Sequence, residues 1–124
     1  MSRNSIYIDS QQTYTFVMEG GVTPRVWTFT APSFPTEIVA LRYASDVANS
    51  TDKASVKVTV DADDRITGTA AATADTVVEF TTADSGKSLV IGAGAKVQLT
   101  VTIAGTAATV VGLVVQLVVK EYRP

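Results

Sequence analysis

Three aspartates close together, Asp61, Asp63 and Asp64, form the only acidic cluster of the 124-residue chain. Carboxylate oxygens are preferred ligands of calcium, but a calcium loop of the EF-hand type has glycine at its sixth position and glutamate at its end. Here the sixth residue is Ile66, and no such glutamate follows. Aspartate side chains also hydrogen-bond to their own backbone in turns. We interpret residues 61–64 as a solvent-exposed turn, and a looser calcium site in a β-turn is the alternative.

The chain contains no cysteine and no histidine. This excludes thiolate zinc sites, Cys-His or Ser-His-Asp nucleophilic catalysis, haem ligation through histidine, and disulfide bonds. Glycoside hydrolysis needs a pair of carboxylates. The glutamates that would supply one lie in no recognisable context for it: Glu19, Glu37, Glu79 and Glu121. The sequence therefore predicts no catalytic residues, no cofactor and no enzyme activity.

The charge of the chain is close to balanced, with 10 basic and 12 acidic residues and a formal net charge of −2. A nucleic-acid binder usually carries a basic excess or a stripe of Lys and Arg, whereas here the basic residues are scattered singly. The first residues lack the apolar core of a signal peptide. The longest apolar run, residues 107–119, is too short for a membrane helix. We expect a soluble protein made in the cytoplasm without a signal peptide, with neither nucleic acid nor membrane as a partner.

The composition favours β-strands, because 19 Val, 6 Ile and 18 Thr make up about a third of the residues. Apolar and polar residues alternate in short segments that turn residues separate about every ten positions, which is typical of strands. In the clearest example Val56, Val58 and Val60 face inward. The segments with strand character are residues 13–18, 26–30, 37–43, 55–61, 65–69, 76–82, 88–91, 96–103 and 108–122.

These segments predict an all-β fold, an antiparallel β-sandwich of the jelly-roll kind with eight to ten short strands. We expect residues 1–10 to form an N-terminal arm and residues 11–124 a single β-sandwich domain. Alternation does not encode long-range pairing, so an immunoglobulin-like topology stays open. For residues 37–43 we prefer a strand, with Val39, Leu41 and Tyr43 on one face, over the alternative of a helix, and we allow a short helical turn near residues 46–49.

The last strand is apolar on both faces, whereas an antiparallel sandwich strand is usually apolar on one. Its inner face would carry Val111, Leu113, Val115, Leu117 and Val119. Its outer face would carry Val110, Val114, Gln116 and Val118, which are our candidates for an oligomer interface. Either a neighbouring subunit covers this face, or a loop or the arm around Ile6 and Ile8 packs over it.

Aromatic side chains are the usual means of binding a sugar ring, and the candidates are Tyr7, Tyr14, Trp27, Tyr43 and Tyr122. Trp27 alternates in phase with Phe29. We therefore expect Trp27 to pack in the core rather than to bind a ligand.

The whole-chain pattern resembles the small β-jelly-roll decoration, or cement, proteins of tailed bacteriophage heads. The resemblance rests on the short chain without Cys or His, the strands rich in Val, Thr and Ala, the polar lead of residues 1–5, the closing strand of residues 110–122 and the charged tail of residues 120–123. It implies a structural protein of the virion that assembles as a homotrimer on the outer capsid surface. There it would clamp neighbouring major capsid proteins and stabilise the head.

An extended arm can add to the edge of a neighbour's sheet, so residues 1–10 are a candidate capsid contact. The residues concerned are Arg3, Asn4, Ile6, Tyr7 and Ile8. The alternative functions are a fibre, receptor-binding or carbohydrate-binding β-sandwich domain.

Overall fold

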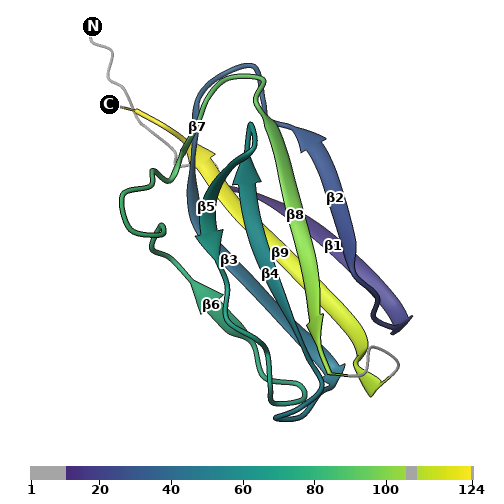
Figure 1. The fold of residues 1–124 in the computed structure, drawn as a ribbon. Coiled ribbons are helices and arrows are strands. Elements are labelled where there is room, and N and C mark those ends of the chain that lie inside the picture. The colour runs from purple at the N-terminus through teal and green to yellow at the C-terminus, as the bar shows by residue number, and fades with distance from the viewer. Residues whose placement is uncertain (1–10, 106–108, 124) are drawn as a thin grey trace, which may run out of the picture.

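Two antiparallel β-sheets face each other in the computed structural model, which describes residues 11–105 and 109–123 (Figure 1). Sheet A contains, in spatial order, β1 (Gln11–Gly21), β9 (Val111–Glu121), β3 (Thr36–Val47) and β6 (Val78–Phe80), and β7 (Val90–Ile91) also pairs with β3. Sheet B contains β2 (Arg25–Thr30), β8 (Lys96–Ala104), β4 (Lys53–Val60) and β5 (Asp63–Thr67). The described residues contain no helix that is long and apolar enough to cross a membrane.

The strand pairs are nested in the order of the chain. The outermost pair is β1 with β9, followed by β2 with β8, then β3 with β6 and β7, and finally the hairpin of β4 with β5. A long antiparallel hairpin that is wrapped into two sheets gives this order, and it is the order of a jelly roll. The predicted fold class is therefore confirmed. The pairing also decides against the immunoglobulin-like topology that alternation had left open.

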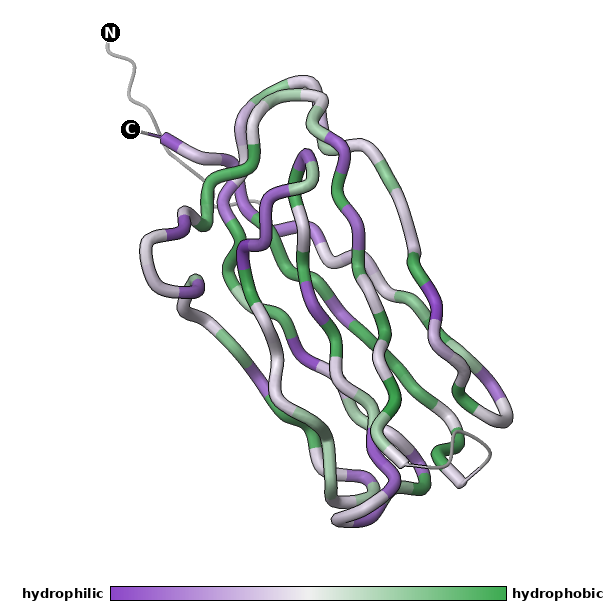
Figure 2. The backbone as a smooth tube through the Cα atoms, viewed as in Figure 1, coloured by the Kyte–Doolittle hydropathy of each residue, from purple (hydrophilic) through white to green (hydrophobic). Residues whose placement is uncertain are grey.

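The core lies between the sheets and follows the predicted alternation. Val56, Val58 and Val60 of β4 are buried, as are Val97 and Leu99 of β8. Lys57 and Gln98 between them point outward, so apolar and polar colours alternate along these strands in Figure 2. Burial of one such aliphatic side chain contributes about 1.5–3 kcal/mol. The face-to-face arrangement of the sheets follows from this pattern.

The turn predicted at residues 61–64 is a tight hairpin between β4 and β5. Asp61 and Ala62 both have positive φ, 48° and 66°, as in a type I′ turn, whose twist matches that of the flanking strands. The backbone N–H of Asp61 donates to the carbonyl oxygen of Lys96 at 2.9 Å. The Asp61 side chain accepts a hydrogen bond from the Lys96 N–H at 3.0 Å. The backbone and the side chain of Asp61 therefore connect this turn to the start of β8.

Two expectations for β3 were wrong. The register with β9 shifts between Ile38 and Ala40, and this bulge places Val39 out of phase with Leu41 and Tyr43. Ile38, which is only 2% exposed, fills the inner position instead. The strand then continues to Val47, so there is no helical turn at residues 46–49. Asn49 caps a turn there, because its side-chain Oδ1 accepts hydrogen bonds from the backbone N–H groups of residues 51 and 52, both at 2.8 Å.

The loop between β6 and β7 covers the outer edge of β5. Asp84 Oδ1 accepts a hydrogen bond from the Thr67 N–H at 2.9 Å, and the Asp84 N–H donates to the Arg65 carbonyl oxygen at 2.8 Å. The Arg65 guanidinium donates to the carbonyl oxygens of Ser88 at 3.0 Å and Val90 at 2.6 Å. Edge strands need such protection against pairing with other chains. The same contacts connect sheet B to sheet A on this side.

Tyr43 anchors the middle of the core. Its ring stacks on Phe80 with 5.8 Å between centroids, and its hydroxyl donates to the carbonyl oxygen of Thr69. Burial raises the pKa of Tyr43 to about 12. Gly68 lies against this hydroxyl: a Cβ there would collide with it and would lie 2.7 Å from the Val56 carbonyl oxygen. A glycine is required at this position for steric reasons.

Gly68→Ala should destabilise the fold by about 1–3 kcal/mol, the usual cost of overpacking a core. A Cβ at Gly92 would meet nothing within 4 Å, so Gly92→Ala is the matched control and should cost far less. Tyr43→Phe removes the colliding hydroxyl, so Gly68→Ala should cost about 1 kcal/mol less in that background. Denaturant unfolding of these variants and the wild type measures the differences. Equal effects of the two glycine substitutions would contradict the steric explanation.

Acid should weaken the contact between the loop and β5. The hydroxyl and backbone N–H of Thr67 donate to Asp84 and hold the pKa of that carboxyl below its usual value. A lowered pKa stabilises the fold above the unfolded value of about 3.9, and this contribution is lost as pH falls through the folded pKa. Melting temperature should therefore fall less steeply with acid in Asp84→Asn than in the wild type. Glu19→Gln, on exposed β1, should keep the wild-type slope, and an unchanged slope in Asp84→Asn would refute the assignment.

A candidate interaction surface on the outer face of sheet A

A row of exposed apolar side chains crosses the outer face of sheet A. Cross-strand pairing aligns Val17 of β1 with Val114 of β9, and Val114 with Ala44 of β3. Val77, just before β6, lies beside Ala44. Val17 is 55% exposed, Val114 39% and Val77 60%. We name these four residues the valine row.

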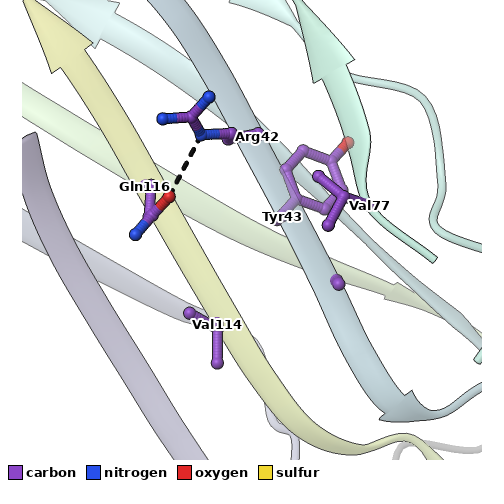
Figure 3. Close-up of a pocket in the computed structure, with 6 residues that line it drawn as sticks. Arg42, Tyr43, Val77, Val114 and Gln116 are labelled. Carbon is purple, nitrogen blue, oxygen red and sulfur yellow. Dashed lines mark hydrogen bonds between the residues drawn. The ribbon is translucent and has the colours of Figure 1, made fainter. Parts of the chain in front are cut away.

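A polar row lies next to the valine row. The register aligns Thr15, Gln116, Arg42 and Glu79 across the same four strands. The Arg42 guanidinium donates through Nε to Gln116 Oε1 at 3.0 Å and through a terminal nitrogen to Glu79 Oε2 at 3.2 Å. Figure 3 shows Arg42 and Gln116 turned toward each other from neighbouring strands. The hydrogen bonds hold the guanidinium in place beside apolar surface.

The two rows enclose a shallow hollow of about 170 Å³ (Figure 3). Its lining residues come from β3, β9 and the residue just before β6: Arg42, Tyr43, Ala44, Val77, Val114 and Gln116. The apolar part suits small aliphatic groups, and the Arg42 and Gln116 side chains can hydrogen-bond to carbonyl or carboxylate oxygens. Such a surface fits a protein partner, because apolar contact area and a few oriented polar groups occur together.

The predicted interface on β9 is only partly on this face. Val114 and Gln116 lie there, but Val110 is fully buried in the core. Gly112 has φ of +70°, and this left-handed residue breaks the alternation, so that Val110 returns to the inside. Val118 is on the outer side of the strand but only 3% exposed, so it needs no second subunit to cover it. Val110 is therefore removed from the candidate interface.

The boundary of the face near the end of β3 is acidic. Glu19 and Asp46 are exposed, and the Asp46 carboxylate lies directly over Gly112, where a Cβ would collide with it. A larger residue at position 112 would displace that carboxylate. On this face the next outward residue after Val17 is Glu19, and the next after Ala44 is Asp46. The surface therefore changes from apolar to negatively charged directly beside the valine row. The candidate arm contacts Arg3, Asn4, Ile6, Tyr7 and Ile8 lie outside the described residues.

The predicted aspartate cluster is divided among separate partners. Asp63 forms ion pairs with Lys87, at 2.7 Å, and with Arg65, at 2.9 Å. The hydrogen bond and the charge of Lys87 lower the pKa of Asp63, and the same contact raises the pKa of Lys87. This carboxylate already has two cations as neighbours.

The other two carboxylates point elsewhere. Asp64 pairs with Lys57 at 3.4 Å, and Asp61 accepts a hydrogen bond from the N–H of Lys96 at the start of β8. In the part of the chain that the structure describes, no three acidic, Cys or His side chains converge as a metal site would require. The geometry supports the interpretation of residues 61–64 as a solvent-exposed turn.

Trp27 packs at the rim of the core, as predicted. Its ring stacks on Phe16 at 5.1 Å between centroids, and the Arg25 guanidinium lies 5.9 Å from its ring centroid. Tyr43 is likewise inside the sandwich. Tyr43 is 1% exposed, and the partly buried Trp27 ring has Phe16 and Arg25 against it, so neither ring has the open flat face of a sugar-binding platform.

Sequence reasoning missed the residues that complete the outer face. Val17 and Arg42 each occupy an outward position in a predicted strand, and this alternation was the only local signal. Arg42 and Gln116 are 74 positions apart, and Arg42 and Glu79 are 37 apart. Only the strand order brings them together.

Calcium should leave the stability of the protein unchanged. The carboxylates of residues 61–64 are turned toward different cations and backbone groups, so a calcium ion would have to break the Asp63 ion pairs. Melting temperature in millimolar calcium and in excess chelator should agree within error. A calcium-dependent rise that Asp63→Asn abolishes would restore the calcium site.

Comparison with known proteins leaves the family open. No protein-family model matches the chain, and no curated protein sequence is similar to it. Among solved structures, the C-terminal domain of EclA, a sugar-binding protein, is 12% identical over 94% of this chain and 84% of its own, with a TM-score of 0.45. Structures of the Gt and Gx strains of infectious bursal disease virus are 14% and 15% identical, with TM-scores of 0.42 and 0.36. They match 94% and 98% of this chain but only 31% and 40% of the viral chains. Similarities at this level assign no function, and the fold assignment rests on the strand pairing.

Proposed function

We propose that the protein is a non-enzymatic structural protein of a phage virion, a capsid decoration or cement protein that binds the outer surface of the head and stabilises it. The observation that carries this proposal is the valine row beside the polar row on sheet A. Exposed apolar side chains aligned across four strands indicate a protein contact. The Arg42–Gln116–Glu79 hydrogen bonds would give that contact a fixed orientation.

The physical properties of this face suit stoichiometric attachment. A partly exposed valine gains at most about 1 kcal/mol on burial, so the valine row alone gives a weak contact. A specific interface usually buries about 1,200–2,000 Å² in total. A capsid offers many equivalent sites, and attachment at several of them multiplies the effective affinity. Residues 1–10, including Ile6 and Ile8, would supply the second contact by adding to the edge of a capsid protein's sheet.

The distribution of charge also supports a structural role. In the described residues the acidic and basic side chains that come close together pair with one another, as in Asp63 with Lys87 and Glu79 with Arg42. A catalytic acid or base needs access to substrate and a pKa suited to proton transfer. These exposed ion pairs hold the strands and loops in register instead.

The carbohydrate-binding alternative has less support from the geometry. Tyr43 is buried, the partly buried Trp27 stacks on Phe16, and the partly buried Tyr14 stacks on Phe29 at 4.4 Å. The hollow beside Arg42 has polar groups but no aromatic ring exposed on its floor. A sugar site would be expected to have one.

The purified protein should co-sediment with assembled heads of its parent phage at a fixed ratio to the major capsid protein. Val114→Lys places a charge in the hollow and should weaken attachment roughly tenfold or more, a change of about 1.4 kcal/mol. Thr102→Lys is the matched control, because Thr102 is exposed on the outer face of sheet B. Deletion of residues 2–10 should also weaken attachment without unfolding the sandwich.

Absence of co-sedimentation by the wild-type protein would refute the proposal. An equal loss of capsid attachment in Val114→Lys and Thr102→Lys would show that the contact is not specific to the outer face of sheet A. Binding to an oligosaccharide array, with protection of an aromatic side chain, would favour the carbohydrate-binding alternative.

A further inference from the structure

The two long sides of the sandwich differ in how their edges are covered. On one side, the loop at Asp84 bonds to β5 and links it to sheet A. On the other side, β1 ends sheet A and β2 ends sheet B, and no described residue pairs with the outer edge of either strand. Figure 1 shows β1 and β2 side by side at this margin. We name it the open side.

The open side lacks the usual protection of an edge strand. Such edges are normally interrupted by Pro, by Lys or by a bulge, or they are kept very short. β1 has eleven residues, and its first eight, Gln11 to Met18, contain no charged residue and no proline. The register shift in β1 comes only after Met18, near the end of the strand. The edge is therefore long, regular and uncharged over about 26 Å.

Aromatic rings fill the space between the sheets on the open side. Tyr14 stacks on Phe29, and Phe16 stacks on both Trp27 and Phe29 at 5.1 and 5.8 Å between centroids. All four rings are only partly buried. Partly exposed aromatic rings are the side chains that contribute most to protein interfaces.

Apolar surface continues around both corners of the open side. Val17 is 55% exposed on the outer face of sheet A, and Val26 is 50% exposed on the outer face of sheet B. They belong to β1 and β2, the two strands that carry the aromatic rings. Backbone edge, aromatic rings and valines thus form one apolar strip.

We propose that the open side binds a second copy of this chain, with β1 pairing antiparallel to β1 across a two-fold axis. The two copies of sheet A then form one continuous sheet, and the aromatic rings of the two copies pack beside the new strand pair. An antiparallel edge is complementary to itself, because residues related by the axis exchange the same hydrogen bonds.

The placement of charge favours this occupant. Glu19 is the one charged residue of β1 and lies three residues from Phe16, the middle of the strand. In the two-fold arrangement the two Glu19 side chains are about 20 Å apart, which is beyond the range of unscreened repulsion in salt. A strongly charged partner would find no counter-charges along residues 11–18 of β1, and the Arg25 guanidinium of β2 already lies against the Trp27 ring. The surface that best matches the uncharged edge of β1 is another uncharged strand edge, and β1 of a second copy of this chain is such an edge.

A two-fold edge contact closes as a dimer, which differs from the trimer that the resemblance to cement proteins implies. It leaves the outer face of sheet A accessible and brings Val17 of one copy near Val17 of the other. The dimer does not depend on the proposed capsid function, because it concerns the isolated protein.

Light scattering after size-exclusion chromatography tests the dimer. We expect twice the chain mass of 13.0 kDa at about 100 µM chain, well above the dissociation constant of an ordinary dimer. Thr15→Lys puts two lysines beside the two-fold axis and should give a monomer. Thr15 is exposed, so the fold should tolerate the lysine. Thr102→Lys, on an interior strand of sheet B, should remain a dimer.

Two further measurements on the wild-type protein test the dimer even if Thr15→Lys does not fold. Trp27 is the one tryptophan of the chain and lies on the open side, so its emission should shift to longer wavelength as the wild-type dimer is diluted. The β1 amides that do not bond to β9 should exchange more slowly in the dimer than after dilution.

A wild-type monomer at about 100 µM chain, a trimer, or a dimer that persists unchanged in folded Thr15→Lys would each overturn the proposal. A monomer that dimerises only after deletion of residues 2–10 would also overturn it, since the N-terminal segment would then be covering the edge. Loss of capsid attachment by a protein that still dimerises would refute only the proposed function.

Discussion

The position of β9 between β1 and β3 is the constraint on which the rest of the structure depends. Its inner residues Leu113, Val115, Leu117 and Val119 are at most 2% exposed, and each contributes about 1.5–3 kcal/mol by burial. Its backbone bonds to strands from the first half of the chain on both sides. The first strand and the last are thereby held together, and the nested order of the remaining pairs follows.

The same central position explains why β9 is apolar on both sides. On the inside it closes the core. On the outside Val114 lies in the valine row, while Val118 is buried beside Ala40. An interior strand has neighbours on both edges, so its outer side chains are shielded more than those of an edge strand. The outer face of sheet A can therefore bury an apolar side chain such as Val118 on its central strand, while Val17 on the edge strand stays 55% exposed.

Local alternation was enough to predict the strands and most of the core, because Val56, Val58 and Val97 alternate with polar residues along their strands. It failed where the backbone interrupts the alternation. The bulge at Val39 and the left-handed Gly112 each move a side chain to the other face, and both depend on pairing with a distant strand. The candidate site was less predictable, since Arg42, Gln116 and Glu79 meet only through the jelly-roll order and no sequence motif marks them.

The unequal sides of the sandwich have a consequence for its motions. Arg65 and Asp84 connect β5 to β7 and to the loop before it. Along β1 and β2, by contrast, the described side chains of the two sheets meet through stacked rings, which have no directional bonds, and residues 22–24 join the two strands at one end. Local opening begins where the fewest hydrogen bonds must break. We therefore expect the two sheets to separate first along β1 and β2 and to stay together longest at β5. Water will reach the core first beside Tyr14 and Trp27, and last beside Ile66.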